Sequence, residues 1–331
     1  MHALSSTSTS TSLRIGLIYN PLGGLARKHH HAISTILSEL PEVLQWEIST
    51  VDDFDNAVNA LIQSKIEWLI IIGGDGTIQG VFTRIFSRLP TSQWPSISII
   101  PGGTTNMTAF DLGIHDKPNL ILERLKQHLN QSTNNSVLKT INKAVMRIEQ
   151  TGQPTLYGMF LGLGLIARGV KFSRSRIKQI GITGNIFTTI IVLRSLIGTF
   201  LGRPHPTWAP VQIMLPHTNE ANRSQPYLLA MISTLDRILM GIHPYWGQEK
   251  ASLHATFVAQ HCTRFWLAML KIILKQGRSL KKEHGYLSYN TESLELLLDD
   301  EYIVDGELFY ASSQQGPLKI SAKEMVKFLI L

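Results

Sequence analysis

Short apolar runs alternate with helical periodicity in the first part of the chain. Runs with few polar residues occupy 15–19, 68–72 and 97–100 and predict buried strands, and 46–50 is expected to add another. Apolar residues recur at helical spacing around 33–40, 58–66, 78–86 and 117–129. Strand–helix–strand units of this kind predict an α/β domain built on a doubly wound parallel sheet.

The pattern changes after the polar, helix-breaking segment 130–136. Short strands are then expected at 145–149, 157–165, 211–215, 228–233, 294–298, 302–304 and 318–320. They predict an antiparallel β-sandwich as a second domain. We therefore expect a disordered Ser/Thr-rich tail at 1–12, the α/β domain at 13–135 and a β-rich domain at 136–331. The C-terminal strands are candidates for packing back toward the first domain.

Three glycine-containing loops follow predicted strands and begin at Asn20, Gly73 and Pro101. The carboxyl ends of parallel strands are where such sheets bind ligands. In the loop from Gly73 to Thr77, glycines let backbone N–H groups approach a ligand, and the next helix offers its N-terminus to phosphate. Asp75 in this loop would repel phosphate unless a divalent cation, or a hydroxyl losing its proton, intervenes.

Four motifs in the same order resemble those of the diacylglycerol kinase, sphingosine kinase and NAD kinase superfamily. They are Asn20-Pro21-Leu22-Gly23-Gly24, Gly73-Gly74-Asp75-Gly76-Thr77, Pro101-Gly102-Gly103-Thr104-Thr105-Asn106 and Asp305-Gly306-Glu307. The resemblance favours the lipid-kinase branch. It implies a nucleotide site in the cleft between the domains, with ATP and Mg²⁺ as cofactors. It also implies transfer of the γ-phosphoryl group to the hydroxyl of a diacylglycerol-like or related lipid at a membrane surface, as in phospholipid metabolism.

The resemblance assigns candidate roles to individual residues. The candidates for nucleotide binding are Asn20, Thr50, Gly73, Gly74, Asp75, Gly76, Thr77, Gln79, Thr104 and Asn106. The catalytic candidates are Asp75, Asp305 and Glu307, and Glu307 is expected to take the proton of the lipid hydroxyl. The sequence does not separate these three roles and leaves the metal ligands open. Without the resemblance, Asp305-Gly306 predicts a hairpin turn.

Two departures from the family pattern keep other interpretations open. After Gly-Gly-Asp-Gly-Thr the family usually has Asn-Glu one residue later, whereas this chain has Gln79-Gly80. After the third motif the family often has Asp, whereas this chain has Met107. An NAD kinase-like enzyme and a catalytically impaired nucleotide- or lipid-binding module are therefore the alternatives. The segment after Thr105 does not resemble that of NAD kinases.

Composition narrows the partners and the compartment. The chain has 331 residues, one cysteine, Cys262, and a net charge of +7, which fits a reducing, cytoplasmic compartment and anionic partners. No base-reading motif supports nucleic-acid binding. Charges and glycines interrupt the apolar stretch 177–201, so no transmembrane insertion is expected. Basic, apolar segments around 168–178 and 265–282 leave peripheral membrane contact open, and a homodimer stays open as well.

Overall fold

The computed structural model describes residues 13–130, 138–180, 210–215 and 224–331. The tail expected to be disordered, the boundary segment after residue 130 and most of the apolar stretch 177–201 lie outside these residues. Within the described ranges, no helix combines the length and the apolar composition needed to cross a bilayer.

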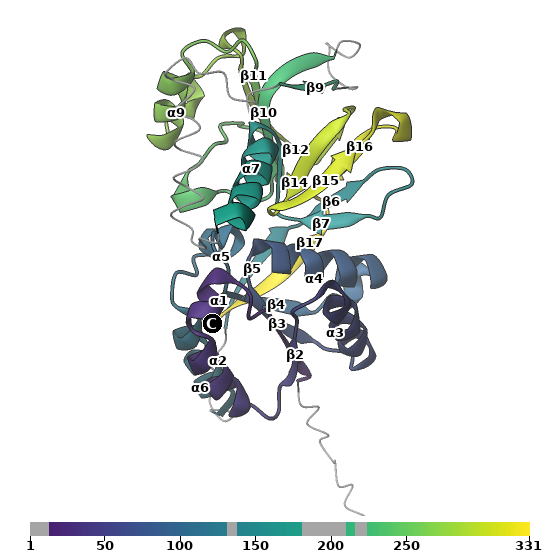
Figure 1. The fold of residues 1–331 in the computed structure, drawn as a ribbon, viewed down its shortest axis with the longest axis vertical. Coiled ribbons are helices and arrows are strands. Elements are labelled where there is room, and N and C mark those ends of the chain that lie inside the picture. The colour runs from purple at the N-terminus through teal and green to yellow at the C-terminus, as the bar shows by residue number, and fades with distance from the viewer. Residues whose placement is uncertain (1–12, 131–137, 181–209, 216–223) are drawn as a thin grey trace, which may run out of the picture.

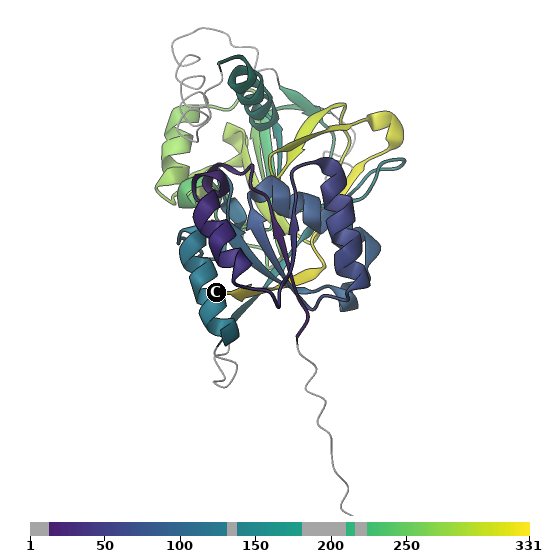
Figure 2. The same ribbon diagram turned by 60° about the horizontal axis from the view of Figure 1, so that its bottom comes forward.

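The first domain contains a six-stranded sheet in the order β2-β1-β3-β4-β17-β5. Four of its strands are the expected parallel ones: β1 (Ile15–Tyr19), β2 (Leu44–Glu47), β3 (Trp68–Gly73) and β4 (Ser96–Pro101). Helices α2 (His30–Ser38) and α6 (Pro118–Asn130) cover one face, and α3 (Val51–Gln63) and α4 (Asp75–Arg88) cover the other (Figure 2). The parallel α/β prediction is confirmed.

The second domain contains two antiparallel sheets. The larger has the order β12-β11-β10-β8-β14-β15 with β9 paired to β10, and the smaller has the order β13-β16-β6-β7. Their bounds are β6 (Met146–Glu149), β7 (Leu156–Gly158), β8 (Phe160–Gly164), β9 (Val211–Ile213), β10 (Gln225–Ser233), β11 (Leu253–Ala259), β12 (Tyr286–Thr291), β13 (Ser293–Leu296), β14 (Asp300–Val304), β15 (Glu307–Ala311) and β16 (Leu318–Ser321). Apolar side chains from both sheets, such as Phe257 and Leu296, share one core, which confirms the β-sandwich.

Two strands that follow residue 136 complete the first sheet. β17 (Met325–Ile330) runs parallel to β4 and antiparallel to β5 (Lys139–Ala144), so the chain returns from the second domain to the first (Figure 1). The sequence pattern did not predict either strand. β5 is a polar edge strand that buries only its last residue, Ala144, so it carries no apolar run. β11 and β12 were not predicted either.

The second strand of the first sheet lies earlier than expected. It ends at Glu47, whereas the sequence predicted a strand over 46–50. Thr50 is instead the N-cap of α3, where its hydroxyl accepts a bond from the Asp53 N–H at 3.3 Å. The Asp53 carboxylate accepts the Thr50 N–H at 2.7 Å, which completes a capping box. A Thr followed three residues later by a carboxylate marks a helix start, and this signal outweighs the strand preference of the residues before it.

Helix α4 rests against the second domain through β7. The Thr83 hydroxyl donates to the Tyr157 carbonyl at 3.2 Å and accepts the Tyr157 N–H at 3.0 Å. The rings of Phe86 and Trp94 pack edge-on against the Tyr157 ring. These contacts hold the second domain against the helix that begins at the central glycine loop.

Candidate active site

The three glycine-containing loops meet at the carboxyl edge of the first sheet. The Gly102 N–H donates to the Gly73 carbonyl at 2.8 Å. The Gly102 carbonyl accepts the N–H groups of Leu25 and Ala26, in α1 (Gly24–Lys28), at 3.0 and 2.8 Å. Backbone bonds therefore join the loops that begin at Asn20, Gly73 and Pro101 into one surface.

Two glycines of this surface pack backbone against backbone. A Cβ on Gly103 would lie 2.3 Å from the Gly74 Cα, and a Cβ on Gly74 would lie 2.9 Å from the Gly103 Cα. Neither approach is compatible with a side chain. The glycines are therefore needed to bring the second and third loops together at the start of α4.

In the first turn of α4, the N-cap residue is Gly74, which has no side chain to cap the helix. Asn20 supports this turn, because its Nδ2 donates to the Thr77 Oγ1 at 2.9 Å. Its Oδ1 accepts the Leu22 N–H at 2.9 Å, which fixes the first loop. The N-terminus of a 14-residue helix thus faces the loops with the N–H groups and positive partial charge that suit a phosphate.

Asp75 is buried, with 4 % of its surface exposed, and it caps a neighbouring helix. Its Oδ2 accepts the Thr105 hydroxyl at 2.9 Å and the Met107 N–H at 3.0 Å, and its Oδ1 accepts the Thr108 N–H at 3.0 Å. Met107 and Thr108 open helix α5 (Met107–Asp111). Hydrogen bonds to a charged acceptor are strong, so these donors stabilise the buried carboxylate.

Asn106 and Thr104 occupy the third loop in different ways. Asn106 has a left-handed φ of 49°, and its side chain closes on Gly103, with Oδ1 accepting the Gly103 N–H at 2.8 Å and Nδ2 donating to the Gly103 carbonyl at 3.1 Å. Asn106 therefore shapes the loop. Thr104 is exposed, and its hydroxyl lies 2.9 Å from where a Cβ on Gly24 would stand, so it lies where the first and third loops meet.

The Asp305-Gly306 turn brings two carboxylates from the far end of the chain. It joins β14 to β15, with Val304 paired to Glu307, and both turn residues have left-handed φ values of 48° and 92°. Positive φ at both central residues is what a two-residue type I′ hairpin requires. The predicted turn is thus present.

The Asp305 carboxylate is buried against the start of β8. Its two oxygens accept the N–H groups of Met159 and Phe160, each at 2.9 Å. Gly158 makes room for it, since a Cβ there would lie 2.6 Å from the Asp305 Oδ2. Burial, and then the charge of Asp75, raise the pKa of Asp305 well above its ordinary value, and the two N–H donors oppose this shift.

Glu307 is the carboxylate that reaches the central loop. Its Oε1 lies 2.9 Å from where a Cβ on Gly76 would stand, and its Cγ and Cδ lie 3.6 Å from that point. The side chain therefore extends over the first turn of α4 and is only half-buried. The structure thus brings Glu307, in the last motif of the chain, to Gly76 of the Gly73–Thr77 loop, a separation of 231 residues in sequence.

Residues 14–137 match the family model of the diacylglycerol kinase catalytic domain. The first domain belongs to this family. The chain shares its fold with three solved structures from Bacillus anthracis str. Sterne, one named a diacylglycerol kinase and two named putative diacylglycerol kinases. Their TM-scores are 0.61, 0.58 and 0.60 at 19 %, 17 % and 18 % identity, over 96 % of this chain and 96–97 % of each of theirs. No curated protein matches the chain by sequence.

One departure from the diacylglycerol kinase motif, Gly80, has a packing explanation. A Cβ on Gly80 would lie 2.9 Å from the Phe54 ring of α3, so that ring occupies the space into which a glutamate would extend. The Gln79 amide donates to Thr83 at 3.0 Å and thus faces the seam with β7. Met107 is buried and contributes its backbone N–H to Asp75. The sequence did not reveal the role of Thr105 as a donor to Asp75, since nothing in its pattern distinguishes it from Thr104.

Among the described residues, no three His, Cys, Asp or Glu side chains form a group that could hold a metal ion by themselves. A kinase-family domain uses a nucleotide, and nucleotide phosphates supply oxygen ligands to Mg²⁺. This ion usually keeps several waters and takes only one or two protein carboxylates. Both oxygens of Asp75 and of Asp305 accept backbone N–H groups, so nucleotide phosphates and water would supply most ligands of the ion.

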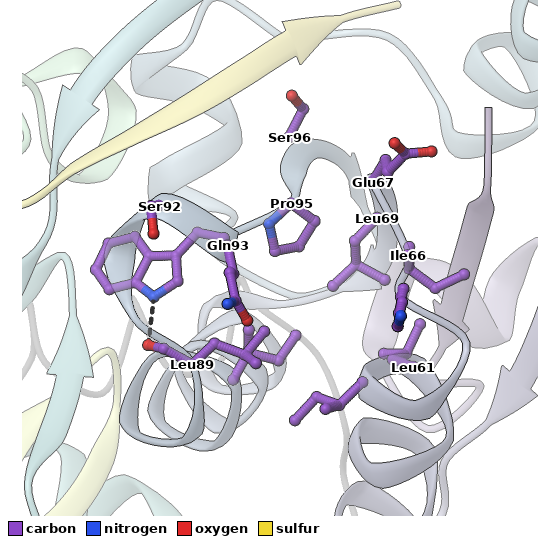
Figure 3. A pocket seen from close by; sticks show the side chains of 13 residues that line it. Leu61, Ile66, Glu67, Leu69, Leu89, Ser92, Gln93, Pro95 and Ser96 are labelled. Carbon is purple, nitrogen blue, oxygen red and sulfur yellow. Dashed lines mark hydrogen bonds between the residues drawn. The ribbon is translucent and has the colours of Figure 1, made fainter. Parts of the chain in front are cut away.

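A separate hollow lies at the opposite edge of the first sheet. Leu61, Ile66, Trp94 and Pro95 line it, beside the residues that immediately precede β3 and β4 (Figure 3). The Trp94 indole N–H donates to the Leu89 carbonyl at 3.1 Å in its wall. It lies at the amino ends of the strands, away from the edge where parallel sheets bind ligands, so we do not assign the reaction to it.

Proposed function

We propose that the protein is an ATP- and magnesium-dependent lipid kinase that phosphorylates the hydroxyl of a diacylglycerol-like lipid. The observation that carries the proposal is the position of the Glu307 carboxylate over Gly76, at the start of α4. The glycine-containing surface, which we propose holds phosphates, and a carboxylate of the second domain therefore lie side by side. Phosphoryl transfer requires this pairing, because the protein mainly positions groups and neutralises charge.

The glycine-containing surface is proposed to hold the nucleotide phosphates. Gly73, Gly74 and Gly76 keep side chains away from the N-terminus of α4, and Thr77, Asn20 and Asn106 fix the loops. Thr104, exposed at the junction with Gly24, is the hydroxyl best placed to touch a ligand directly. Thr50 and Gln79 would act through the structure, because their side chains cap α3 and bind Thr83.

Glu307 is proposed as the general base. Asp75 and Asp305 each accept N–H groups on both carboxylate oxygens, whereas Glu307 extends from the edge of β15 over the loop. Glu307 would take the proton of the lipid hydroxyl as that oxygen bonds to the γ-phosphorus and the bond from phosphorus to the β-phosphate oxygen breaks. Bound Mg²⁺ would offset the charge of the phosphates at this step.

The test is transfer of labelled phosphate from ATP in the presence of Mg²⁺ to lipids in mixed micelles. The panel contains diacylglycerol, monoacylglycerol and sphingosine as lipid acceptors, and NAD. We expect Glu307→Gln to lower turnover by about 10²- to 10⁴-fold, the range for loss of a general base, and to leave nucleotide affinity within a few-fold. Glu292→Gln, an exposed glutamate in the β12–β13 turn, is the matched control.

Three outcomes would refute the proposal. Transfer to NAD alone would indicate an NAD kinase, and nucleotide binding without transfer to any acceptor would indicate an impaired module. Wild-type turnover in Glu307→Gln would show that another group accepts the proton.

A further inference from the structure

Helix α9 (Phe265–Ile273) exposes an apolar face to solvent. It lies on the outer flank of the second domain in both views (Figure 1; Figure 2). Leu267, Leu270 and Ile273, together with Leu274 just after the helix, are 45 %, 50 %, 57 % and 56 % exposed. Single exposed apolar side chains are ordinary in proteins, but four on successive turns form a patch, and such patches mark interaction surfaces.

The patch is bordered by positive charge. Residues 264–284 contain six Lys or Arg residues and one Glu, so this segment has a net charge of +5, compared with +7 for the whole chain. Arg264, Lys275, Arg278, Lys281 and Lys282 are exposed. Arg264, Lys271 and Lys281 also line a hollow between α9 and the segment that leads to β12. Cationic groups thus border the apolar side chains, and three of these groups line a hollow.

We propose that α9 and the basic segment 274–282 dock the protein on an anionic lipid bilayer. An apolar helix face with basic residues beside it suits the boundary between acyl chains and negatively charged headgroups. The hollow lined by Arg264, Lys271 and Lys281 would take headgroup phosphates.

A second copy of the chain fits this surface poorly. A two-fold contact places the same patch against itself, so the basic border of one copy would face that of the other. Like charges brought together in this way disfavour association. A bilayer presents the opposite charge.

The surface is attached to the rest of the second domain at its N-terminal end and along its inner side. The Tyr286 hydroxyl of β12 donates to the Thr263 carbonyl at 2.7 Å, and Ala268 and Ile272 bury the inner side of α9. Exposed residues of α9 can therefore be replaced without removing these contacts.

The experiment is co-sedimentation of the full chain, without nucleotide, with vesicles of phosphatidylcholine alone or mixed with phosphatidylglycerol. We expect binding only to the anionic vesicles, weaker at high salt. Leu267→Ser/Leu270→Ser/Ile273→Ser and Lys275→Glu/Arg278→Glu/Lys281→Glu should each reduce binding by about tenfold or more. Leu120→Ser, 47 % exposed on α6, and Lys139→Glu/Lys323→Glu/Lys327→Glu, exposed in or beside the first sheet, are the matched controls and should bind as wild type.

A second measurement does not depend on multiple substitutions. Trp266 is 36 % exposed on α9, so vesicles with brominated acyl chains should quench wild-type fluorescence more than that of Trp266→Phe. Equal binding to neutral vesicles, wild-type binding by either triple variant, or no difference in quenching would overturn the proposal. A dimer in solution that the serine variant abolishes would assign the face to a second copy.

This inference stands apart from the proposed kinase activity. The binding assay contains no nucleotide and no lipid acceptor, so an inactive protein could still pass it. Phosphorylation of a short-chain, water-soluble diacylglycerol should be unchanged in both triple variants, because none of these residues lies at the glycine loops.

Discussion

Gly76→Ala is expected to move the proposed base, Glu307, without unfolding the domain. The methyl group would stand 2.9 Å from the Glu307 Oε1, so that oxygen must move by about 0.5 Å to reach ordinary contact. The group that moves is the end of a flexible side chain, and the three nearest atoms to the methyl all belong to Glu307. The substitution therefore displaces Glu307, and nucleotide affinity is measured beside turnover because Gly76 also belongs to the proposed phosphate surface.

The effects on stability nearly cancel. Alanine is favoured over glycine within a helix by about 0.5–1 kcal/mol, and a strained Glu307 rotamer costs about 0.5–1.5 kcal/mol. The free energy of unfolding should therefore stay within about 1 kcal/mol of wild type. Turnover should fall by about 10- to 100-fold, because displacements of this order at a catalytic group carry such penalties.

Gly80→Ala is the matched control on the same helix. Its methyl group would also meet a neighbour at 2.9 Å, but that neighbour is the Phe54 ring and not Glu307. We expect this variant to lose up to about 2 kcal/mol of stability by overpacking and to keep its turnover. The measurements are urea unfolding and initial rates at saturating ATP and lipid. A folded Gly76→Ala protein with wild-type turnover would refute the assignment of Glu307.

Two further predictions concern buried ionisable groups. Asp305→Asn should lose about 1–3 kcal/mol, because its amide cannot accept the N–H groups of both Met159 and Phe160. The pKa of Asp305 is raised in the folded state, so the folded protein holds this proton more tightly than the unfolded chain. In urea unfolding, the difference in free energy of unfolding between wild type and Asp305→Asn should therefore shrink as pH rises from about 4. A difference that grows with pH would contradict this. Burial lowers the pKa of His254, but its bonds to Asp236 and Asn290 and the charge of Asp236 together outweigh burial and raise this pKa. The pair should therefore add up to about 1 kcal/mol to the free energy of unfolding at acidic pH, and this is lost as pH rises through the pKa of folded His254. A plot of melting temperature against pH should show a slope for wild type that His254→Gln lacks. Equal slopes would contradict the prediction.

The sequence predicted the parts of the site that depend on local chemistry. Uninterrupted apolar runs located β1 and β3, and the glycines after them located the loops at the carboxyl edge. The Asp-Gly pair located the β14–β15 turn, because both residues tolerate positive φ. Each of these signals lies within a few residues of the feature it predicts.

The pattern failed where a residue's role is set by a distant partner. Asp75 was expected to need a cation or a hydroxyl, yet N–H groups more than 30 residues away already bind both of its oxygens. β17 pairs Phe328 with Ile97, a separation of 231 residues, and no local periodicity encodes that neighbour. Thr50 and Gln79 were assigned from motif position, whereas their side chains bind neighbouring structure.

The way the two domains are joined bears on how Glu307 keeps its place. The chain leaves the first sheet after β5 and re-enters it at β17, and these two strands are neighbours. The Val145 N–H also donates to the Glu324 carbonyl at 3.0 Å, so the two crossings are bonded to each other where they leave the sheet. Thr83 and Tyr157 fix a third point, at the seam between α4 and β7. A rigid rotation of the second domain would have to break the bond between the two crossings and the bonds between Thr83 and Tyr157. The contact between Glu307 and the Gly73–Thr77 loop is therefore a feature of the resting fold, and it does not require domain closure to form.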